Sequence, residues 1–135
     1  MTSRLEMKGR LETIKRSWMS VLVVDDDPGV CKAIKLLLRF DGHQVQTVNG
    51  GAEALALIEL CKFDLVITDF AMPGMKGDQL AARIRQHRPD QPIIMATASA
   101  DEFSAYGRPP AGVDCVLNKP FSRIELREAM ARVLN

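Results

Sequence analysis

Neither a long apolar stretch nor a signal-peptide pattern is present in this sequence, so we expect no membrane-spanning or secreted form. The charges are nearly balanced, with 18 basic and 17 acidic side chains, which provides no strong field to attract nucleic acid or an anionic membrane. We therefore expect a cytoplasmic protein that binds neither. Its 135 residues, 47% of them hydrophobic, suit one globular domain with a single core.

Cysteine and histidine are too few and too scattered to build a disulfide framework or a metal site. Cys31, Cys61 and Cys115 are odd in number and lie within apolar patterns, which predicts buried, reduced thiols. His43 and His87 have no cysteine or histidine at metal-ligand spacing and are predicted to be surface residues. The glycine-rich motifs of nucleotide and dinucleotide sites are also missing, so we expect no organic cofactor.

The most informative stretch is residues 63–77, where a short apolar run ends on a carboxylate. Residues 65–67 are apolar and rich in β-branched side chains, a pattern typical of a buried strand. Asp69 comes at its end, and a loop with one proline and two glycines follows. In open parallel sheets, functional sites lie at the carboxyl ends of the strands, which is where Asp69 is predicted to be. We expect Asp69 to be a nucleophile that accepts a phosphoryl group.

The rest of the chain alternates strands with helices. Strands are predicted at residues 21–24, 44–48, 65–67, 92–97 and 114–117, each followed by a helix, the fourth of which is a short one at 101–108. This alternation predicts an α/β fold: a doubly wound, five-stranded parallel sheet of the flavodoxin-like type, with strand order 2-1-3-4-5 and five helices. The weakly apolar strand at 44–48 suits a sheet edge.

Two helix starts carry clear capping signals. Asp27 is predicted to N-cap a helix that has Pro28 in its first position. Ser122 and Glu125 have the S-x-x-E spacing of a capping box before the last helix. These local signals fix where the first and last helices begin.

Polar side chains stand at the ends of four predicted strands: Asp25 and Asp26, Asp69, Thr97 and Lys119. Each alone has a simpler interpretation, as a turn residue, a helix cap or a solvated charge. Parallel strands bring their carboxyl ends to one edge, so together they predict one cleft. Three carboxylates there would repel, and Mg²⁺, a hard ion that also binds phosphate, would relieve the repulsion. Thr97 and Lys119 would then contact the phosphoryl oxygens, and the product would be an acyl phosphate.

Residues 1–19 differ from the rest of the chain. Met7, Leu11, Ile14 and Trp18 have the spacing of one helix face, and the charged residues of the segment are five basic and two acidic ones. We expect an N-terminal extension that serves as a helical linker or a dimerisation helix, with a frayed tail as the simpler alternative.

From residue 21 to about residue 134 the chain resembles the receiver domain of bacterial two-component response regulators. The matching segments are residues 23–28 (VVDDDP), 68–77 (TDFAMPGMKG), 96–98 (ATA) and 119–121 (KPF). The resemblance implies a receiver domain at residues 20–135, preceded by the extension at 1–19.

The same resemblance implies the roles of individual residues. Asp69 matches the phosphoacceptor, and Thr97 and Lys119 match the hydroxyl and the ammonium that bind phosphate. Asp25, Asp26, Asp69 and the backbone carbonyl of Ala71 match the Mg²⁺ ligands, with Asp26 the expected direct ligand of the acidic pair. A cis peptide bond is implied between Lys119 and Pro120.

Two departures from the family pattern stand out. Val116 occupies a position, three residues before the lysine, where many members carry an aromatic residue, so the resemblance does not imply an aromatic switch. Ala71 and Ser99 occupy the two variable positions thought to tune hydrolysis of the acyl phosphate, and the Ala71 side chain cannot position water.

The implied partners are a histidine kinase or a histidine phosphotransfer domain, docking on the first helix around residues 30–37, and a downstream protein target. The sequence around Asp69 is similar to that of receivers fused to hybrid sensor kinases. We expect a phosphoprotein that catalyses only its own phosphorylation and dephosphorylation, as a monomer or weak dimer. Two alternatives are a degenerate receiver used only for protein binding, and an Asp-nucleophile phosphatase of the haloacid-dehalogenase type. The phosphatase would need a second aspartate where this chain has Ala71.

Overall fold

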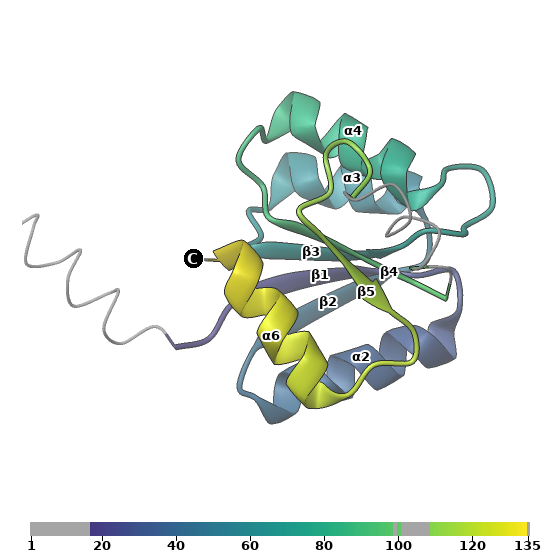
Figure 1. Ribbon diagram of the computed structural model, residues 1–135. Helices are drawn as coiled ribbons and strands as arrows, with labels where there is room; N and C mark the ends of the chain where they lie inside the picture. Colours follow the sequence, from purple (N-terminus) through teal and green to yellow (C-terminus); the bar gives the residue numbers. More distant parts are fainter. Residues whose placement is uncertain (1–16, 99, 101–108, 135) are drawn as a thin grey trace, which may run out of the picture.

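The computed structural model describes residues 17–98, 100 and 109–134 (Figure 1). Within these ranges the chain forms five strands and four helices, which alternate up to β4. In order they are β1 (Ser20–Val24), α2 (Pro28–Phe40), β2 (Gln44–Val48), α3 (Gly51–Leu60), β3 (Leu65–Asp69), α4 (Gly77–His87), β4 (Ile93–Thr97), β5 (Cys115–Asn118) and α6 (Arg123–Leu134). The predicted helix at 101–108, and any helix before residue 17, lie outside the described residues.

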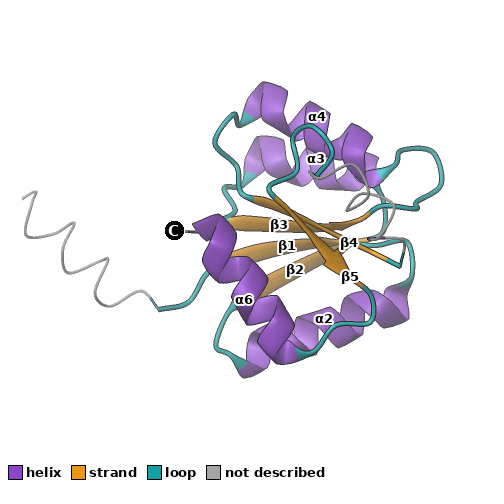
Figure 2. Ribbon diagram, viewed as in Figure 1, coloured by secondary structure: helices purple, strands orange, loops and turns teal. Residues whose placement is uncertain are grey.

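The five strands form one sheet with the order β2-β1-β3-β4-β5, and all four neighbouring pairs are parallel. Helices α2 and α6 cover one face, and α3 and α4 cover the other (Figure 2). The predicted flavodoxin-like fold and strand order are confirmed. The edge position of β2 is confirmed as well, and its side chains are half-buried or exposed whereas those of β3 and β4 are all buried.

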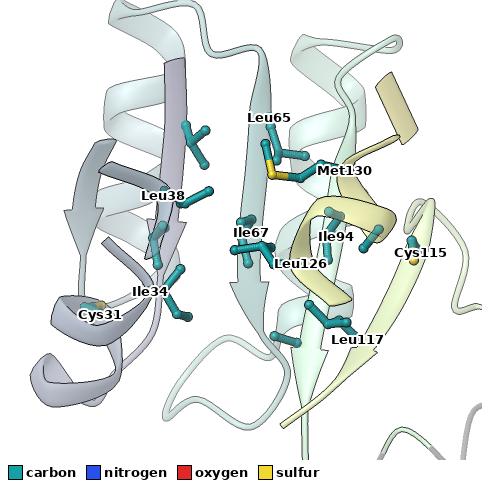
Figure 3. Packing of buried hydrophobic residues seen from close by; sticks show 14 residues of the cluster. Cys31, Ile34, Leu38, Leu65, Ile67, Ile94, Cys115, Leu117, Leu126 and Met130 are labelled. Atoms are coloured by element: carbon teal, nitrogen blue, oxygen red, sulfur yellow. The ribbon is translucent and has the colours of Figure 1, made fainter. Parts of the chain in front are cut away.

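Each face of the sheet has its own hydrophobic core, because successive side chains of a strand point to opposite faces. Val21 and Val23 of β1 face α2 and α6, whereas Leu22 and Val24 face α3 and α4. Figure 3 shows the first core, in which residues of α2 and α6 pack on the central strands. The labelled residues are Cys31, Ile34, Leu38, Leu65, Ile67, Ile94, Cys115, Leu117, Leu126 and Met130.

Both predicted helix caps are present. A side-chain oxygen of Asp27 accepts hydrogen bonds from the backbone nitrogens of Gly29 at 2.8 Å and Val30 at 3.4 Å. Ser122 Oγ accepts a hydrogen bond from the Glu125 backbone nitrogen at 3.1 Å, and Glu125 Oε1 accepts one from the Ser122 backbone nitrogen at 3.0 Å. A side-chain cap of this kind stabilises a helix by about 1 kcal/mol. The cap at Asp27 also fixes the start of α2 directly after the acidic pair.

Two sequence-based predictions about burial were wrong. Cys61 ends α3 and is half-buried, although Cys31 and Cys115 are buried as expected and all three thiols are free. His43 is half-buried rather than a surface residue, because its Nδ1 accepts a hydrogen bond from the Met19 nitrogen at 2.9 Å.

Smaller differences concern the element ends. The fourth strand begins one residue later than predicted, and the fifth is shifted one residue toward the C-terminus. Among the described residues, no helix has the length and apolarity needed to cross a membrane.

Candidate functional site: an acidic cluster at the carboxyl edge of the sheet

Strands β1 and β3 bring three carboxylates together. The two strands pair in register, with Val24 opposite Thr68, so the residues that follow them are neighbours. Carboxylate oxygens of Asp25, Asp26 and Asp69 lie within 4.8 Å of one another. Asp25 is 2% exposed and Asp69 is also buried, whereas Asp26 is open to solvent. The predicted acidic cleft therefore has one accessible carboxylate and two enclosed ones.

Lys119 enters this cluster from the loop after β5. Its Nζ donates to Asp25 Oδ2 at 2.6 Å and to Asp69 Oδ1 at 3.0 Å. The peptide bond from Lys119 to Pro120 is cis, as the resemblance implied. One ammonium thus bridges two carboxylates that are 44 residues apart in the sequence.

Thr97 is the last residue of β4 and is 3% exposed. Its carbonyl oxygen accepts a hydrogen bond from the backbone nitrogen of Lys119 at 2.9 Å. This bond holds Thr97 next to the segment that carries the lysine. Ala96 lies opposite Asp69 in the sheet register. Ala71 is exposed in the loop that follows Asp69. The structure therefore brings every predicted site residue to one edge of the sheet.

Burial and charge act in opposite directions at this cluster. Burial raises the pKa of the Asp69 carboxyl above its ordinary value, although the hydrogen bond and charge of Lys119 oppose the rise. Burial alone would lower the pKa of Lys119, but its hydrogen bonds to Asp25 and Asp69 outweigh this effect and the pKa is raised. Lys119 is therefore held as a cation.

The donor set suits a hard divalent cation. Three carboxylates and one ammonium leave two negative charges when all four groups are ionised, and the three carboxylates, with oxygens within 4.8 Å of one another, offer only oxygen ligands. The backbone carbonyl of Ala71 belongs to the same loop. Hard cations such as Mg²⁺ take oxygen ligands of this kind and keep several water molecules.

The loop after Asp69 is closed by a glycine whose role the sequence did not reveal. A Cβ atom at Gly77 would collide with the carbonyl oxygen of Asp69. The Gly77 nitrogen donates to the Phe70 carbonyl at 2.9 Å, and Met72 is buried among the side chains of α3 and α4. A glycine opening a helix is a weak signal of such close backbone approach. Gly77 lets the first turn of α4 rest directly on the backbone of Asp69.

Asn49 is a second residue that sequence reasoning missed. Its Nδ2 donates to the carbonyl oxygen of Asp25 at 3.0 Å, and the Cys31 thiol donates to the same oxygen at 3.3 Å. The Asp27 nitrogen donates to Asp25 Oδ1 at 2.9 Å. Asn49 directly follows β2, so its place at the same edge of the sheet could have indicated a contact with the site. Together these contacts hold Asp25 in place at the floor of the cluster.

Several curated proteins are similar to this chain in sequence. The chain is 39% identical over 110 residues to the transcriptional regulatory protein GlrR of Escherichia coli (strain K12), a match that covers 82% of this chain and 25% of GlrR. It is 33% identical over 126 residues to the chemotaxis protein CheY-3 of Vibrio cholerae, covering 91% of this chain and 97% of CheY-3. The chain therefore spans about a quarter of the first relative and nearly all of the second.

Solved structures share the fold. The response regulator TrrA from Thermotoga maritima, solved in complex with Mg(2+)-BeF, superposes with a TM-score of 0.77 at 34% identity, covering 85% of this chain and 98% of that one. A response regulator receiver domain protein from Clostridium thermocellum gives a TM-score of 0.76 at 28% identity, over 86% and 94% of the two chains. The family model of the response regulator receiver domain matches residues 21–131. The chain belongs to this family, the phosphoacceptor signalling domains of two-component systems.

Proposed function

We propose that Asp69 accepts a phosphoryl group from a phosphohistidine donor in a Mg²⁺-dependent reaction, and that the phosphorylated domain changes its binding to partners. The observation that carries this proposal is the shared contact of Lys119 with Asp69 and Asp25, beside the third carboxylate of Asp26. A carboxylate whose charge is compensated by a neighbouring ammonium is suited to nucleophilic attack on phosphorus.

In the proposed reaction an oxygen of Asp69 forms a bond to phosphorus while the N–P bond of the phosphohistidine breaks. The electron pair of that bond goes to the imidazole nitrogen, and a proton on the other ring nitrogen leaves the imidazole neutral. Lys119 and the Thr97 hydroxyl bind the phosphoryl oxygens and offset their growing charge.

Mg²⁺ would be held by Asp25, Asp26, Asp69 and the Ala71 carbonyl, and its charge would make the attack of one anion on another possible. The carboxylate cluster described above supports this ligand set. The Mg(2+)-BeF complex of the related TrrA supports a Mg²⁺ site in this chain as well.

Receiver domains interact with histidine kinases or phosphotransfer proteins. We propose that the donor docks on α2 around residues 30–37. The N-cap of this helix, Asp27, directly follows the acidic pair, so the helix begins beside the site. The downstream target is another protein, and relatives such as GlrR are transcriptional regulators. Residues 1–19 would be an extension or linker to a receiver at 20–135, in a cytoplasmic regulator or a hybrid kinase. Removal of the phosphoryl group would be self-catalysed.

Phosphoramidate or acetyl phosphate tests the proposal without a protein donor. With Mg²⁺, intact-mass spectra of the full chain should show one added phosphoryl group, and Asp69→Asn should show none. Beryllofluoride should bind only when Mg²⁺ is present. Full and lasting labelling of the Asp69→Asn variant would refute the assignment of the acceptor, and an unlabelled wild-type chain would favour a binding-only receiver. The phosphatase alternative has no support from the site, because Ala71 stands where its general acid would be.

A further inference from the structure

Asn49 lies beside the acidic pair, but neither the proposed ligand set nor the proposed phosphoryl transfer includes it. It directly follows the edge strand β2 and is exposed. Its Nδ2 nevertheless donates a hydrogen bond to the carbonyl oxygen of Asp25 at 3.0 Å. An exposed asparagine before two glycines is typical of a turn, and a turn by itself does not require this hydrogen bond.

The backbone of Asn49 is held from the opposite side. Its nitrogen donates to Oε2 of Glu53 at 3.1 Å, and Glu53 belongs to the first turn of α3. The carbonyl of Gly50 accepts a hydrogen bond from the Ala54 nitrogen at 3.1 Å, which binds the next residue to the same turn. Asn49 is therefore anchored to the start of α3 while its amide group extends to the end of β1.

The carbonyl oxygen of Asp25 accepts a second hydrogen bond, from the Cys31 thiol of α2 at 3.3 Å. A carbonyl oxygen has two lone pairs, so these two donors occupy both. Asn49 Nδ2 also lies 3.8 Å from the Cys31 sulfur, so the three groups contact one another. The Asp25 nitrogen donates to the carbonyl of Val48 at 3.1 Å. The end of β2 thus binds both main-chain polar groups of Asp25.

The direction of the Asp25 carbonyl bond determines where Asp26 begins. The peptide group between the two residues is planar, so the carbonyl oxygen of Asp25 and the Cα atom of Asp26 lie in one rigid unit. Two donors that hold the oxygen therefore also hold this Cα atom. Asp26 carries the exposed carboxylate of the cluster, which is not enclosed by other side chains as Asp25 is. Its position depends mainly on the backbone that precedes it.

We propose that Asn49 is a positioning residue for the metal site: it holds the Asp25 carbonyl and thereby places Asp26 as a ligand of Mg²⁺. This inference rests on the Mg²⁺ site of the proposed function and adds to it a residue outside the ligand set. Mg²⁺ demands near-ideal octahedral geometry, so a small displacement of one ligand weakens its binding. Residues that orient the ligands of a metal typically contribute about 10- to 100-fold to its affinity.

The test measures Mg²⁺ binding directly, by calorimetric titration of the full chain without any phosphoryl donor. Asn49→Ala removes the amide and should raise the dissociation constant for Mg²⁺ about tenfold. Asn49→Leu has nearly the shape of asparagine but no donor, and it should show the same loss. Asn49→Gln keeps an amide on a longer side chain and should recover part of the affinity.

Gln46→Ala is the matched control, because it removes an exposed amide from β2 itself. This variant should bind Mg²⁺ as the wild type does. Thermal unfolding in EDTA checks that every variant is folded in the absence of the metal.

Labelling by phosphoramidate separates positioning of the metal ligand from a general structural role. Asn49→Ala should need about tenfold more Mg²⁺ for its half-maximal labelling rate. Its rate at saturating Mg²⁺ should stay within about twofold of the wild type, because Asp69 and Lys119 are unchanged. A general loss of structure would instead lower the labelling rate at every Mg²⁺ concentration.

A double-mutant cycle tests whether Asn49 acts through Asp26. Two residues that act on the same contact are not additive in their effects. In a chain that already carries Asp26→Asn, adding Asn49→Ala should therefore weaken Mg²⁺ binding much less than it does in the wild type.

Three results would overturn the inference. Equal Mg²⁺ affinity of Asn49→Ala and Gln46→Ala would leave Asn49 as a turn residue, without affecting the proposed function. An equal further loss in the Asp26→Asn chain would show that Asn49 does not act through Asp26. A wild-type chain that binds no Mg²⁺ would remove the metal from the proposed function and this inference with it.

Discussion

The ammonium of Lys119 lies 2.6 Å from Oδ2 of Asp25 and 3.0 Å from Oδ1 of Asp69, so one cation serves both a proposed metal ligand and the proposed acceptor. A phosphoryl group on Asp69 would offer this ammonium new oxygen partners. The contact to Asp25 gives Lys119 a second anchor while the partner at Asp69 changes. Lys119 is therefore placed to report the state of the acceptor.

Replacing Lys119 by alanine should leave some labelling by phosphoramidate but remove the response to it. The acceptor and the carboxylates remain, whereas the contact between the ammonium and the phosphoryl group is lost. Amide spectra of labelled and unlabelled Lys119→Ala should then differ much less than those of the wild type, apart from residues next to Asp69. Equally large spectral changes in the two proteins would show that another group couples phosphorylation to the fold.

Mg²⁺ should raise the melting temperature of the wild type, because an ion that binds only the folded state stabilises it. The increase should be smaller in Asp26→Asn, which removes one carboxylate from the cluster. It should be larger in Lys119→Ala, where no ammonium offsets the carboxylates. Scanning calorimetry with Mg²⁺ and with EDTA measures the three shifts. The same shift in all three proteins would place the ion elsewhere.

Gly77→Ala should destabilise the fold by about 1–3 kcal/mol, as overpacking does, and should slow labelling at Asp69. The added methyl group would push against backbone atoms of Asp69 and Phe70, which cannot turn aside as a flexible side chain can. Gly50→Ala is the matched control, since a Cβ there meets only the side chain of Glu53 at 3.8 Å. Urea unfolding and the rate of phosphoramidate labelling measure the two effects. A Gly77→Ala variant as stable as Gly50→Ala would contradict the close contact.

Stability should fall in mild acid because of His43. Burial lowers the pKa of this imidazole, and the nearby Asp41 only partly opposes the effect. The folded state thus binds the proton less readily than the unfolded state, so stability is greatest above the unfolded pKa of about 6.5. It falls as the pH drops from there toward the folded pKa and then levels off. Protonation also removes the Nδ1 acceptor of the Met19 nitrogen.

Urea unfolding between pH 7.5 and pH 5 measures this dependence. His43→Gln should flatten the profile, while His87→Gln, at an exposed position, should leave it unchanged. If the wild type and the His43 variant lose stability in parallel, the proton is taken up by another group.

The parts of this fold that could be predicted from the sequence depend on local pattern. Buried strands are continuous apolar runs, and Asp27 and Ser122 lie where a helix needs a cap. The meeting of Asp25, Asp69 and Lys119 could also be predicted, because in a parallel sheet the strand ends share one edge.

The contacts that could not be predicted depend on the paths of loops. His43 accepts a hydrogen bond from the backbone nitrogen of Met19, 24 residues earlier, and Asn49 donates one to Asp25 across the same separation. Gly77 looks like an ordinary loop glycine until the chain has folded back onto Asp69. No pattern in a short window of sequence contains this information, because each contact joins residues from different elements.

The contact between Gly77 and Asp69 joins main chain to main chain, with no side chain between them to absorb a displacement. A shift of the Asp69 carbonyl toward α4 would therefore press directly on the backbone at the start of that helix. A structural change at Asp69 would thus be passed to the start of α4, and a partner bound there would respond to it without contacting the cleft.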